Sequence, residues 1–237
     1  MKIAIFGDSY SSTYGYSKVN PYASWSMMLA EKYGVKNFSE NGSSLYYMKL
    51  LFDKHQQDFD KIVFCITAPG RLEFKVDTLK NNSKYVPWYQ HIPTIHTIQS
   101  RLTIPELTEL DKNRYKILYE YLLEIQDIEQ EQYHHSMLVK DIINQRPDTI
   151  LIPGFPTSLT DQTDCLEDVT VFEDKIFNKK TGFYRDSRPC HMSLENNKII
   201  FNNVNEAIVN NNNRIDLDIK QFTEPPMEIK ILYEDIK

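Results

Sequence analysis

The sequence predicts an α/β protein, in which a parallel β-sheet is covered by helices on both faces. Short apolar runs rich in β-branched and aromatic residues alternate with longer segments of helical periodicity, in the order strand, helix, strand, helix, strand. A helix that joins two strands forms a right-handed crossover, which makes the strands parallel. The composition agrees with this class, because 41% hydrophobic residues in a chain of 237 allow a substantial core.

Three short apolar runs predict the first three strands. Lys2–Phe6 is expected to be a buried strand that runs into a turn at Gly7. Val35–Phe38 is a weaker second strand. Lys61–Thr67 is the clearest strand of the chain, and it ends before Ala68-Pro69-Gly70.

Start and stop signals mark a helix in each segment between these strands. Asn20 and Pro21 are a capping residue and a first helical residue, and the helix that follows stops at Gly34. In the second segment either Ser43 or Ser44 caps the helix. The apolar face of this second helix consists of Leu45, Met48, Leu51 and Phe52.

A large, mainly helical insertion is expected after the third strand. The next convincing strand, Thr149–Pro153, follows only after about 80 residues, which is too long for a simple loop. The insertion spans about residues 72–146. Its first part, to Pro105, is irregular, and its second part, Glu106–Asn144, predicts a helical hairpin over the edge or mouth of the sheet.

The C-terminal part predicts two helices and an extended tail. A short helix is expected near Val169–Phe177, and a last helix begins near Ser193. Asn210–Asn213 is expected to be a frayed end of that helix. Because repeats and linkers are absent from the sequence, we expect a single domain over residues 1–237, with a C-terminal extension of about 214–237.

The net charge and the lack of long apolar runs limit the kinds of partner. The 27 basic and 33 acidic residues leave a net charge of -6, so neither nucleic acid nor a membrane is an expected partner. No apolar run reaches the roughly 18 residues of a membrane helix, and the N-terminal run is too short for a signal peptide. We therefore expect a cytoplasmic protein that acts on a small or uncharged substrate.

No metal and no organic cofactor are expected. The three cysteines, Cys65, Cys165 and Cys190, are an odd number at spacings that match no zinc motif, which argues for reduced thiols. Gly7 and Gly15 do not form a phosphate-binding glycine pattern after the first strand.

Candidate catalytic residues lie where the expected strands end, because ligands bind parallel sheets at the carboxyl ends of their strands. Ser9, in the turn after the first strand, is a candidate nucleophile near backbone N–H groups. A serine needs a base, and His191 is the one of the six histidines that the topology brings to this edge. Asp186 precedes His191 closely enough to orient the imidazole across a turn.

The same residues also have a structural interpretation. Asp8 and Ser9 can simply cap a turn, and His191 can cap the final helix. The local sequence leaves both interpretations open.

The order of three segments resembles the SGNH (GDSL-type) hydrolases. These segments are Gly7-Asp8-Ser9 after the first strand, Asn41-Gly42 after the second, and Asp186 with His191 before the last helix. The resemblance spans residues 7 to about 200. It implies a flavodoxin-like three-layer α/β/α domain that hydrolyses esters, often removing acetyl groups from sugars.

The resemblance also implies a role for each matching residue. Ser9 is the nucleophile, His191 is the base, and Asp186 orients that base in a Ser-His-Asp triad. The backbone N–H groups of Ser9 and Gly42 form two parts of the oxyanion hole.

Two features depart from the family pattern. The family has a Gly-x-Asn block after the third strand, where this chain reads Thr67-Ala68-Pro69-Gly70-Arg71. Thr67 or Arg71 can replace the missing donor, and Arg71 can instead bind an anionic substrate group or form a surface ion pair. The family spacing between acid and base would place Arg188 at the acid position, so Asp186 serves only if the turn is wider.

The sequence therefore predicts a serine hydrolase that cleaves an ester, such as an O-acetyl or other short acyl ester of a carbohydrate. The main alternative is a catalytically weak or inactive binding or structural module of the same fold, which the missing asparagine favours. A nucleotide-binding or phosphotransfer domain of flavodoxin type is a third alternative. The oligomeric state is left open.

Overall fold

The computed structural model of the chain describes part of its length. The described residues are 1–13, 24–40, 43–69, 108–125, 127–154, 177–178, 183–184, 192, 194–215, 217 and 221–222. Of residues 177–178 and 183–184 it describes the backbone only.

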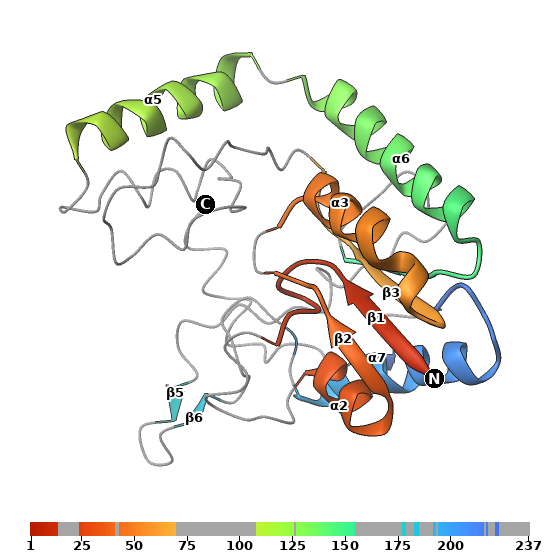
Figure 1. Cartoon of the computed structure of the whole chain (residues 1–237). Coiled ribbons are helices and arrows are strands. Elements are labelled where there is room, and N and C mark those ends of the chain that lie inside the picture. The colour runs from red at the N-terminus through yellow and green to blue at the C-terminus, as the bar shows by residue number, and fades with distance from the viewer. Residues whose placement is uncertain are drawn as a thin grey trace.

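Four parallel strands form the main sheet, in the order β2-β1-β3-β4. Figure 1 shows β2, β1 and β3 side by side. Their bounds are Lys2–Phe6 for β1, Gly34–Asn37 for β2, Lys61–Ile66 for β3 and Ile150–Pro153 for β4. All neighbouring pairs are parallel, with Ile3 of β1 opposite Val35 on one side and Lys61 on the other. The predicted α/β class and its four main strands are confirmed.

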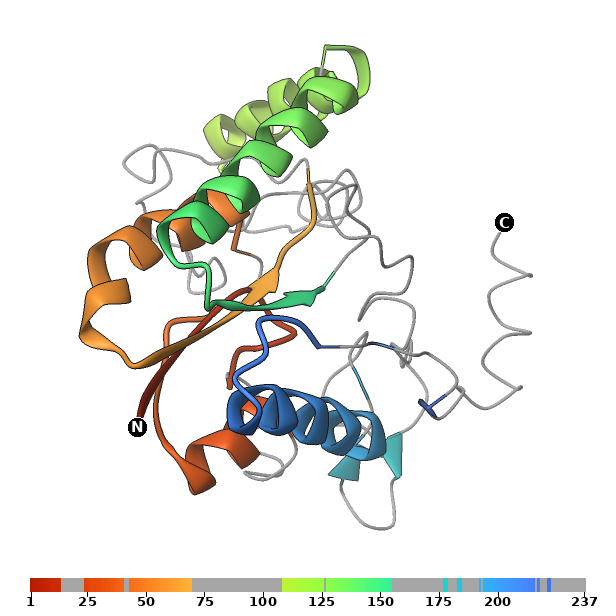
Figure 2. The same cartoon turned by 90° about the vertical axis from the view of Figure 1, so that its right-hand side faces the viewer.

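Helices cover both faces of this sheet. They are α2 (Trp25–Lys32), α3 (Leu45–His55), α6 (Ile128–Gln145) and α7 (Leu194–Val209), with the short 3-10 helix η1 (Gln56–Asp58) after α3. Figure 2 shows α3 and α6 on one side of the sheet and α2 and α7 on the other. A separate antiparallel pair consists of β5 (Phe177–Asn178) and β6 (Phe183–Tyr184).

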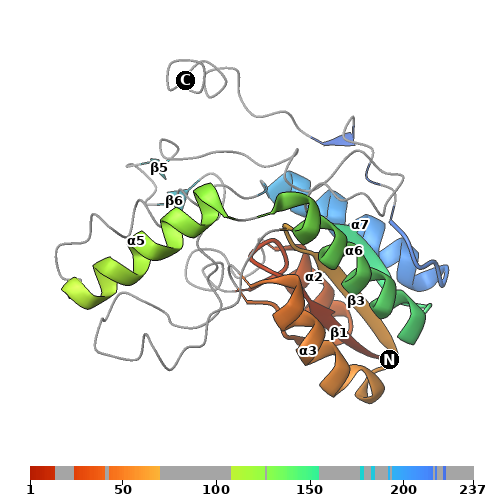
Figure 3. The same ribbon diagram turned by 90° about the horizontal axis from the view of Figure 1, so that it is seen from above.

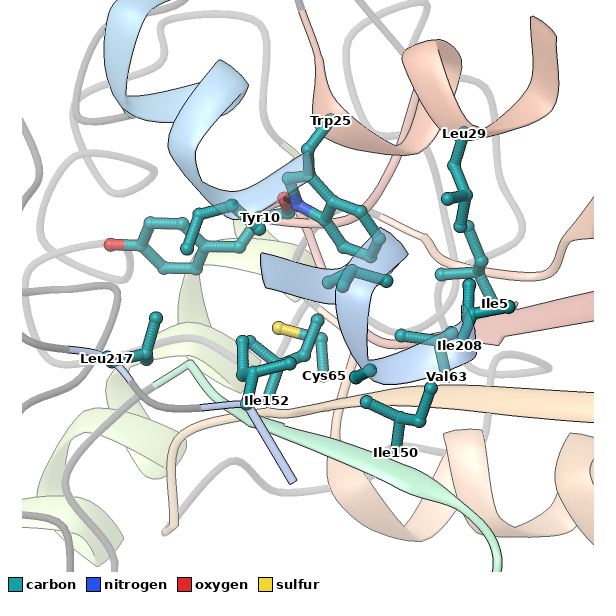
Figure 4. Packing of buried hydrophobic residues seen from close by; sticks show 14 of the residues in the cluster. Ile5, Tyr10, Trp25, Leu29, Val63, Cys65, Ile150, Ile152, Ile208 and Leu217 are labelled. Carbon is teal, nitrogen blue, oxygen red and sulfur yellow. Dashed lines mark hydrogen bonds between the residues drawn. The ribbon is translucent and has the colours of Figure 1, made fainter. Parts of the chain in front are cut away.

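Alternate residues of each strand belong to two hydrophobic cores. Ile3 and Ile5 pack with Trp25 and Leu29 of α2 in the first core, which α7 also covers (Figure 4). Helix α7 contributes Ile200, Val204, Ala207 and Ile208 to this core. The second core, under α3 and α6, contains Ala4, Phe6, Met48, Phe52, Ile62, Phe64, Ile66, Val139 and Ile142. This alternation is what a strand buried on both faces requires.

Helix α2 begins later than the sequence suggested. Its N-cap is Ser24, whose backbone is extended and whose side chain accepts a hydrogen bond from Met27 N at 3.2 Å. The predicted cap at Asn20 was wrong, because Ser24 supplies the side-chain oxygen at the residue where the helix starts. Asn20 and Pro21 themselves lie outside the described residues.

The insertion contains two helices, but they do not form the predicted hairpin. Helix α5 spans Glu109–Glu124, and α6 follows with Asp127 as its N-cap. Figures 1 and 3 show the two helices one after the other in a wide arc rather than side by side. The apolar face of α6 packs on α3, with Val139 and Ile142 in the second core, and α5 contributes no described residue to that core that could hold it beside α6. The irregular first part of the insertion lies outside the described residues.

The end of α7 is capped rather than frayed. Asn211 has φ +55°, Asn211 N donates to Ile208 O at 3.3 Å, and Asn212 N donates to Ala207 O at 2.8 Å. These bonds form a Schellman motif with asparagine in the left-handed position, so the expectation for Asn210–Asn213 was wrong. The helix expected near 169–177 lies outside the described residues, apart from Phe177, which belongs to β5.

Part of the expected C-terminal extension belongs to the first core. Arg214 forms an isolated parallel bridge with Leu151 of β4. Ile215, Leu217 and Phe222 are buried in the same core as Ile3 and Ile5.

No helix of the described residues combines the length and the apolar character that crossing a membrane requires.

Candidate active site

The carboxyl ends of the four parallel strands meet at one edge of the sheet. We call this edge the rim. In the described part of the chain it consists of residues 7–13 after β1, 38–40 and 43 after β2, 67–69 after β3, and 154 after β4. All the predicted site residues that the structure describes lie on this rim.

Gly7 makes the exit from β1 possible. Its φ is +155°, and a Cβ atom there would lie 2.7 Å from Cys65 Cβ and would overlap Ser11 Oγ. Glycine tolerates both the torsion angle and the close approach. The Gly7 carbonyl accepts hydrogen bonds from Glu40 N at 3.1 Å and from Ser43 Oγ at 2.9 Å, which joins the ends of β1 and β2.

The turn of residues 8–12 presents Ser9 to solvent. The Asp8 carbonyl accepts hydrogen bonds from Ser11 N at 3.1 Å and Ser12 N at 2.9 Å, and Asp8 Oδ1 accepts one from Tyr10 N at 3.0 Å. Asp8, Tyr10, Ser11 and Ser12 are buried, whereas Ser9 is partly exposed. The turn-capping interpretation is thus correct for Asp8, while Ser9 takes no part in these bonds.

The segment after β2 holds this turn in place. Asn37 Nδ2 donates to Ser11 O at 2.7 Å, and Asn37 Oδ1 accepts from Ser39 N at 2.9 Å. The hydroxyl of Ser11 donates to Ser39 Oγ at 2.9 Å. Since the contacts join two segments far apart in sequence, the position of Ser9 is set by the sheet and not only by its own turn.

Glu40, which precedes Asn41-Gly42 in the sequence, places a carboxyl group on the rim. Burial raises the pKa of Glu40 above its usual value, and the hydrogen bond from Tyr47 Oη at 3.4 Å opposes this only in part. The rim therefore holds a carboxyl group that takes up a proton more readily than an exposed glutamate does.

His135 of α6 holds the end of β3. Its side chain is buried, and its Nε2 lies 2.7 Å from the Thr67 carbonyl oxygen. Because a carbonyl oxygen only accepts hydrogen bonds, His135 Nε2 carries the hydrogen. The Thr67 side chain is fully buried, and none of the described residues hydrogen-bonds its Oγ1.

The start of α7 lies near the same rim. Met192 is buried in the first core together with Tyr10, and its carbonyl accepts a hydrogen bond from Asn197 Nδ2 at 3.0 Å. Asn197 Oδ1 accepts from Trp25 N at 3.0 Å, and Trp25 Nε1 donates to Tyr10 O at 2.9 Å. A continuous path of hydrogen bonds therefore joins Met192 to the residue after Ser9.

The structure brings two of the predicted site residues to the same edge. Phe6 of β1 pairs with Phe64 of β3, and Ser9 and Thr67 both come just after the ends of these two neighbouring strands. The other predicted site residues, Gly42, Arg71, Asp186 and His191, lie outside the described residues, and so does Arg188.

Two buried polar residues of this region were not predicted from the sequence. His135 shares a helical spacing with Val139 and Ile142, which would have placed it on the buried face of α6. Asn197 has the same kind of spacing to Ile200 and Val204, which would have placed it on the buried face of α7, but nothing in the local pattern indicated which residue its amide binds. Its partner Trp25 is 172 positions away in the sequence.

In the part of the chain that the structure describes, no three His, Cys, Asp or Glu side chains come together as a metal site. Cys65, on β3, is a buried thiol that forms no disulfide bond with the described residues.

The fold and the rim define an α/β protein with an accessible serine at the carboxyl edge of a parallel sheet. In comparisons with known proteins, no protein-family model matches the chain, and no curated protein matches it significantly.

Proposed function

We propose that the chain is a serine hydrolase of the SGNH type that cleaves an ester. The observation that carries this proposal is the exposure of Ser9 in a turn whose other residues are buried. Such a serine, at the carboxyl edge of a parallel sheet, is placed where a substrate can reach it. The contacts of Gly7 and Asn37 hold the turn in one conformation, which is what a nucleophile needs.

The sheet order supports the flavodoxin-like three-layer arrangement that the resemblance implies. The order β2-β1-β3-β4 is the beginning of the order 2-1-3-4-5 found in flavodoxin-like sheets. The helices on both faces agree with three layers. In this proposal the insertion that contains α5 and α6 is an addition to that fold between β3 and β4.

The proposed reaction uses Ser9, His191 and Asp186 as a triad. Ser9 Oγ attacks the ester carbonyl carbon while His191 takes the hydroxyl proton, and Asp186 orients the imidazole. The bond to the alcohol then breaks, and the alcohol leaves with the proton from His191. A water molecule that His191 deprotonates attacks the acyl-serine, which releases the acid and restores Ser9.

The negative charge on the carbonyl oxygen needs hydrogen-bond donors. We propose the backbone N–H groups of Ser9 and Gly42, with either Thr67 or Arg71 in place of the asparagine that the family has. Removing one such donor costs about 3–4 kcal/mol of transition-state stabilisation. Removal of whichever side chain donates, Thr67 or Arg71, should therefore slow the reaction strongly.

Two observations bear on the base and on the substrate. Met192, which follows His191 in the sequence, is joined through Asn197 and Trp25 to Tyr10, which follows Ser9, and this supports the pairing of His191 with Ser9. The net charge of -6 fits a neutral ester better than a polyanion. We therefore propose an O-acyl group on a carbohydrate as the substrate class.

The absence of the family's asparagine after β3 favours a second candidate function, a binding or structural module of the same fold. Such a module would keep Ser9 and the rim but would have lost full oxyanion stabilisation.

A fluorophosphonate probe and a short-chain acetyl ester test the proposal. We expect the wild-type chain to be labelled and to hydrolyse the ester, and Ser9→Ala to abolish labelling and to slow hydrolysis by about a thousandfold or more. Labelling is measured by intact mass and hydrolysis by acetate release, with circular dichroism to verify folding.

Ser136→Ala is the matched control, because Ser136 is a partly exposed serine on α6 that belongs to none of the strand-end segments of the rim. It should be labelled like the wild type. Labelling of Ser9→Ala would refute Ser9 as the nucleophile. A wild-type chain that is neither labelled nor active, yet binds acetylated saccharides, would favour the binding module.

A further inference from the structure

Asn197, in the first turn of α7, has a fully buried side chain that forms hydrogen bonds to residues outside this helix. Nδ2 donates to the Met192 carbonyl at 3.0 Å, and Oδ1 accepts from the backbone N–H of Trp25 at 3.0 Å. Burying an amide costs free energy, which these two bonds offset. Because donor and acceptor are both engaged, the amide has one orientation.

Trp25 continues the connection toward the nucleophile. Its indole ring is fully buried, and Nε1 donates to the Tyr10 carbonyl at 2.9 Å. Figure 4 shows Trp25 inside the first core with Tyr10 beside it. Surrounded by this core, the ring has no room to rotate, so the Tyr10 carbonyl and the backbone of Trp25 keep a constant separation.

The two ends of this path are adjacent in sequence to the two proposed catalytic side chains. Tyr10 follows Ser9, and Met192 follows His191. We propose that Asn197 is a positioning residue that, through Trp25, sets the distance between the Ser9 hydroxyl and the His191 imidazole. This inference rests on the proposed function, since it concerns the same pair of groups.

Positioning matters here because proton transfer from serine to histidine needs a hydrogen bond of about 2.6–3.2 Å. The two groups come from segments far apart in the chain, so neither local turn can set their distance. A displacement of about 1 Å can lower a rate about 100-fold. The path through Asn197 and Trp25 is a direct hydrogen-bonded connection between the two segments.

Helix α7 also contacts α2 elsewhere, which provides a control. Asn205 Oδ1 accepts hydrogen bonds from Lys32 Nζ at 2.8 Å and from Tyr33 Oη at 2.9 Å. These partners lie at the end of α2 just before β2 begins, and therefore at the opposite edge of the sheet from the rim. Asn205 thus joins the same two helices without touching the proposed site.

The experiment uses Asn197→Asp, Trp25→Phe and the double variant that carries both changes. Asn205→Ala is the control. Asn197→Asp keeps the acceptor for Trp25 but loses the amide donor to Met192. Trp25→Phe removes the donor to Tyr10 and part of the ring volume, while it keeps an aromatic ring in the core. We measure the rate of fluorophosphonate labelling at Ser9, together with kcat and KM for a short-chain ester, well below each melting temperature.

We expect each single change to slow labelling and to lower kcat between about 10- and 100-fold, with KM changed less than threefold. The double variant should lose less than the product of the two single effects, because both act on one path. Asn205→Ala should stay within about twofold of the wild type even where its melting temperature falls.

The outcomes separate this inference from the function on which it rests. If the wild type is labelled but Asn197→Asp and Trp25→Phe are labelled at the wild-type rate, or if Asn205→Ala is slowed equally, the positioning role is overturned and the hydrolase proposal stands. If the wild type is not labelled and hydrolyses no ester, both are overturned. If Asn197→Asp does not fold, Trp25→Phe and Asn205→Ala give the same decision.

Discussion

Single residues set the shape of the rim, and Gly7 is the clearest case. Its backbone leaves β1 with φ +155°, and its missing side chain lets Ser11 and Cys65 approach closely. Asn211 has a comparable role at the end of α7, where φ is +55° and the Asn211 side chain accepts a hydrogen bond from Lys61 at 2.8 Å. Both positions need a residue that tolerates an unusual backbone conformation.

Gly7→Ala is expected to lower the free energy of unfolding by about 2–4 kcal/mol, because the new methyl group overlaps Ser11 Oγ and the φ angle becomes strained. Urea denaturation measures the change. Gly34→Ala is the control, since the nearest heavy atom to its Cβ is Met1 O at 3.7 Å. That variant should differ from the wild type by less than about 1 kcal/mol. Equal losses in the two variants would contradict this explanation.

At the scale of elements, an ion-pair group joins α3 to α6. Lys49 Nζ lies 2.6 Å from Asp53 Oδ1 on its own helix and 2.6 Å from Asp141 Oδ2 on α6. Burial by itself lowers the pKa of Lys49, but the hydrogen bonds and charges of Asp141 and Asp53 raise it overall. The hydrogen bond from Lys49 lowers the pKa of Asp141 below its usual value.

Lys49→Met should change the free energy of unfolding at pH 7 by no more than about 1 kcal/mol, since both carboxylates are about half exposed and the apolar stem is kept. A carboxyl group with a lowered pKa stabilises the fold above its unfolded pKa and loses this effect as the pH falls through the folded pKa. The stability advantage of the wild type over Lys49→Met should therefore shrink below about pH 4.

Urea denaturation at several pH values measures the stability difference between the wild type and Lys49→Met. Lys54→Met is the control, because it makes the same charge change at an exposed position of α3. Lys54→Met should show no such pH-dependent difference. A difference between the wild type and Lys49→Met that is constant from pH 7 to pH 3 would refute the role of Asp141.

At the scale of the whole molecule, the chain closes its first core with residues that follow the last helix. Leu151 N donates to Asn213 O at 3.2 Å, which places this segment against β4. Figure 4 shows Leu217 at the same end of the core as Tyr10. Ile215, Leu217 and Phe222 are buried in this core, so the described residues after α7 are part of the folded unit.

Leu217→Ala should therefore lower the free energy of unfolding by about 2–4 kcal/mol, because it leaves a cavity in this core. Thermal and urea denaturation measure the effect. Val209→Ala on α7, where the side chain is 66% exposed, should stay within about 0.5 kcal/mol of the wild type. A Leu217→Ala variant as stable as Val209→Ala would show that the C-terminal segment does not stabilise the fold.

Much of the fold could be predicted, and less of the candidate site. The strands β1, β3 and β4 and the cap at Ser44 follow from apolar runs and a local capping pattern, which need only neighbouring residues. The start of α2 was missed because Asn20-Pro21 and Ser24 are both acceptable starts, and the hydrogen bond to Met27 favours the latter. The sequence placed Ser9 correctly just after a strand. It could not show that Ser9 is partly exposed while the other residues of its turn are buried, because the turn is held by Asn37, in a distant segment.

By itself the sequence determined the α/β class, the parallel sheet and the rim position of Ser9, because these depend on residues a few positions apart. Only the tertiary structure decided that α6 packs on α3, that His135 binds the end of β3, and that Asn197 joins Trp25 to Met192. These contacts join residues up to 172 positions apart. Their free energy arises only when the whole core excludes water, so no local pattern of residues encodes them.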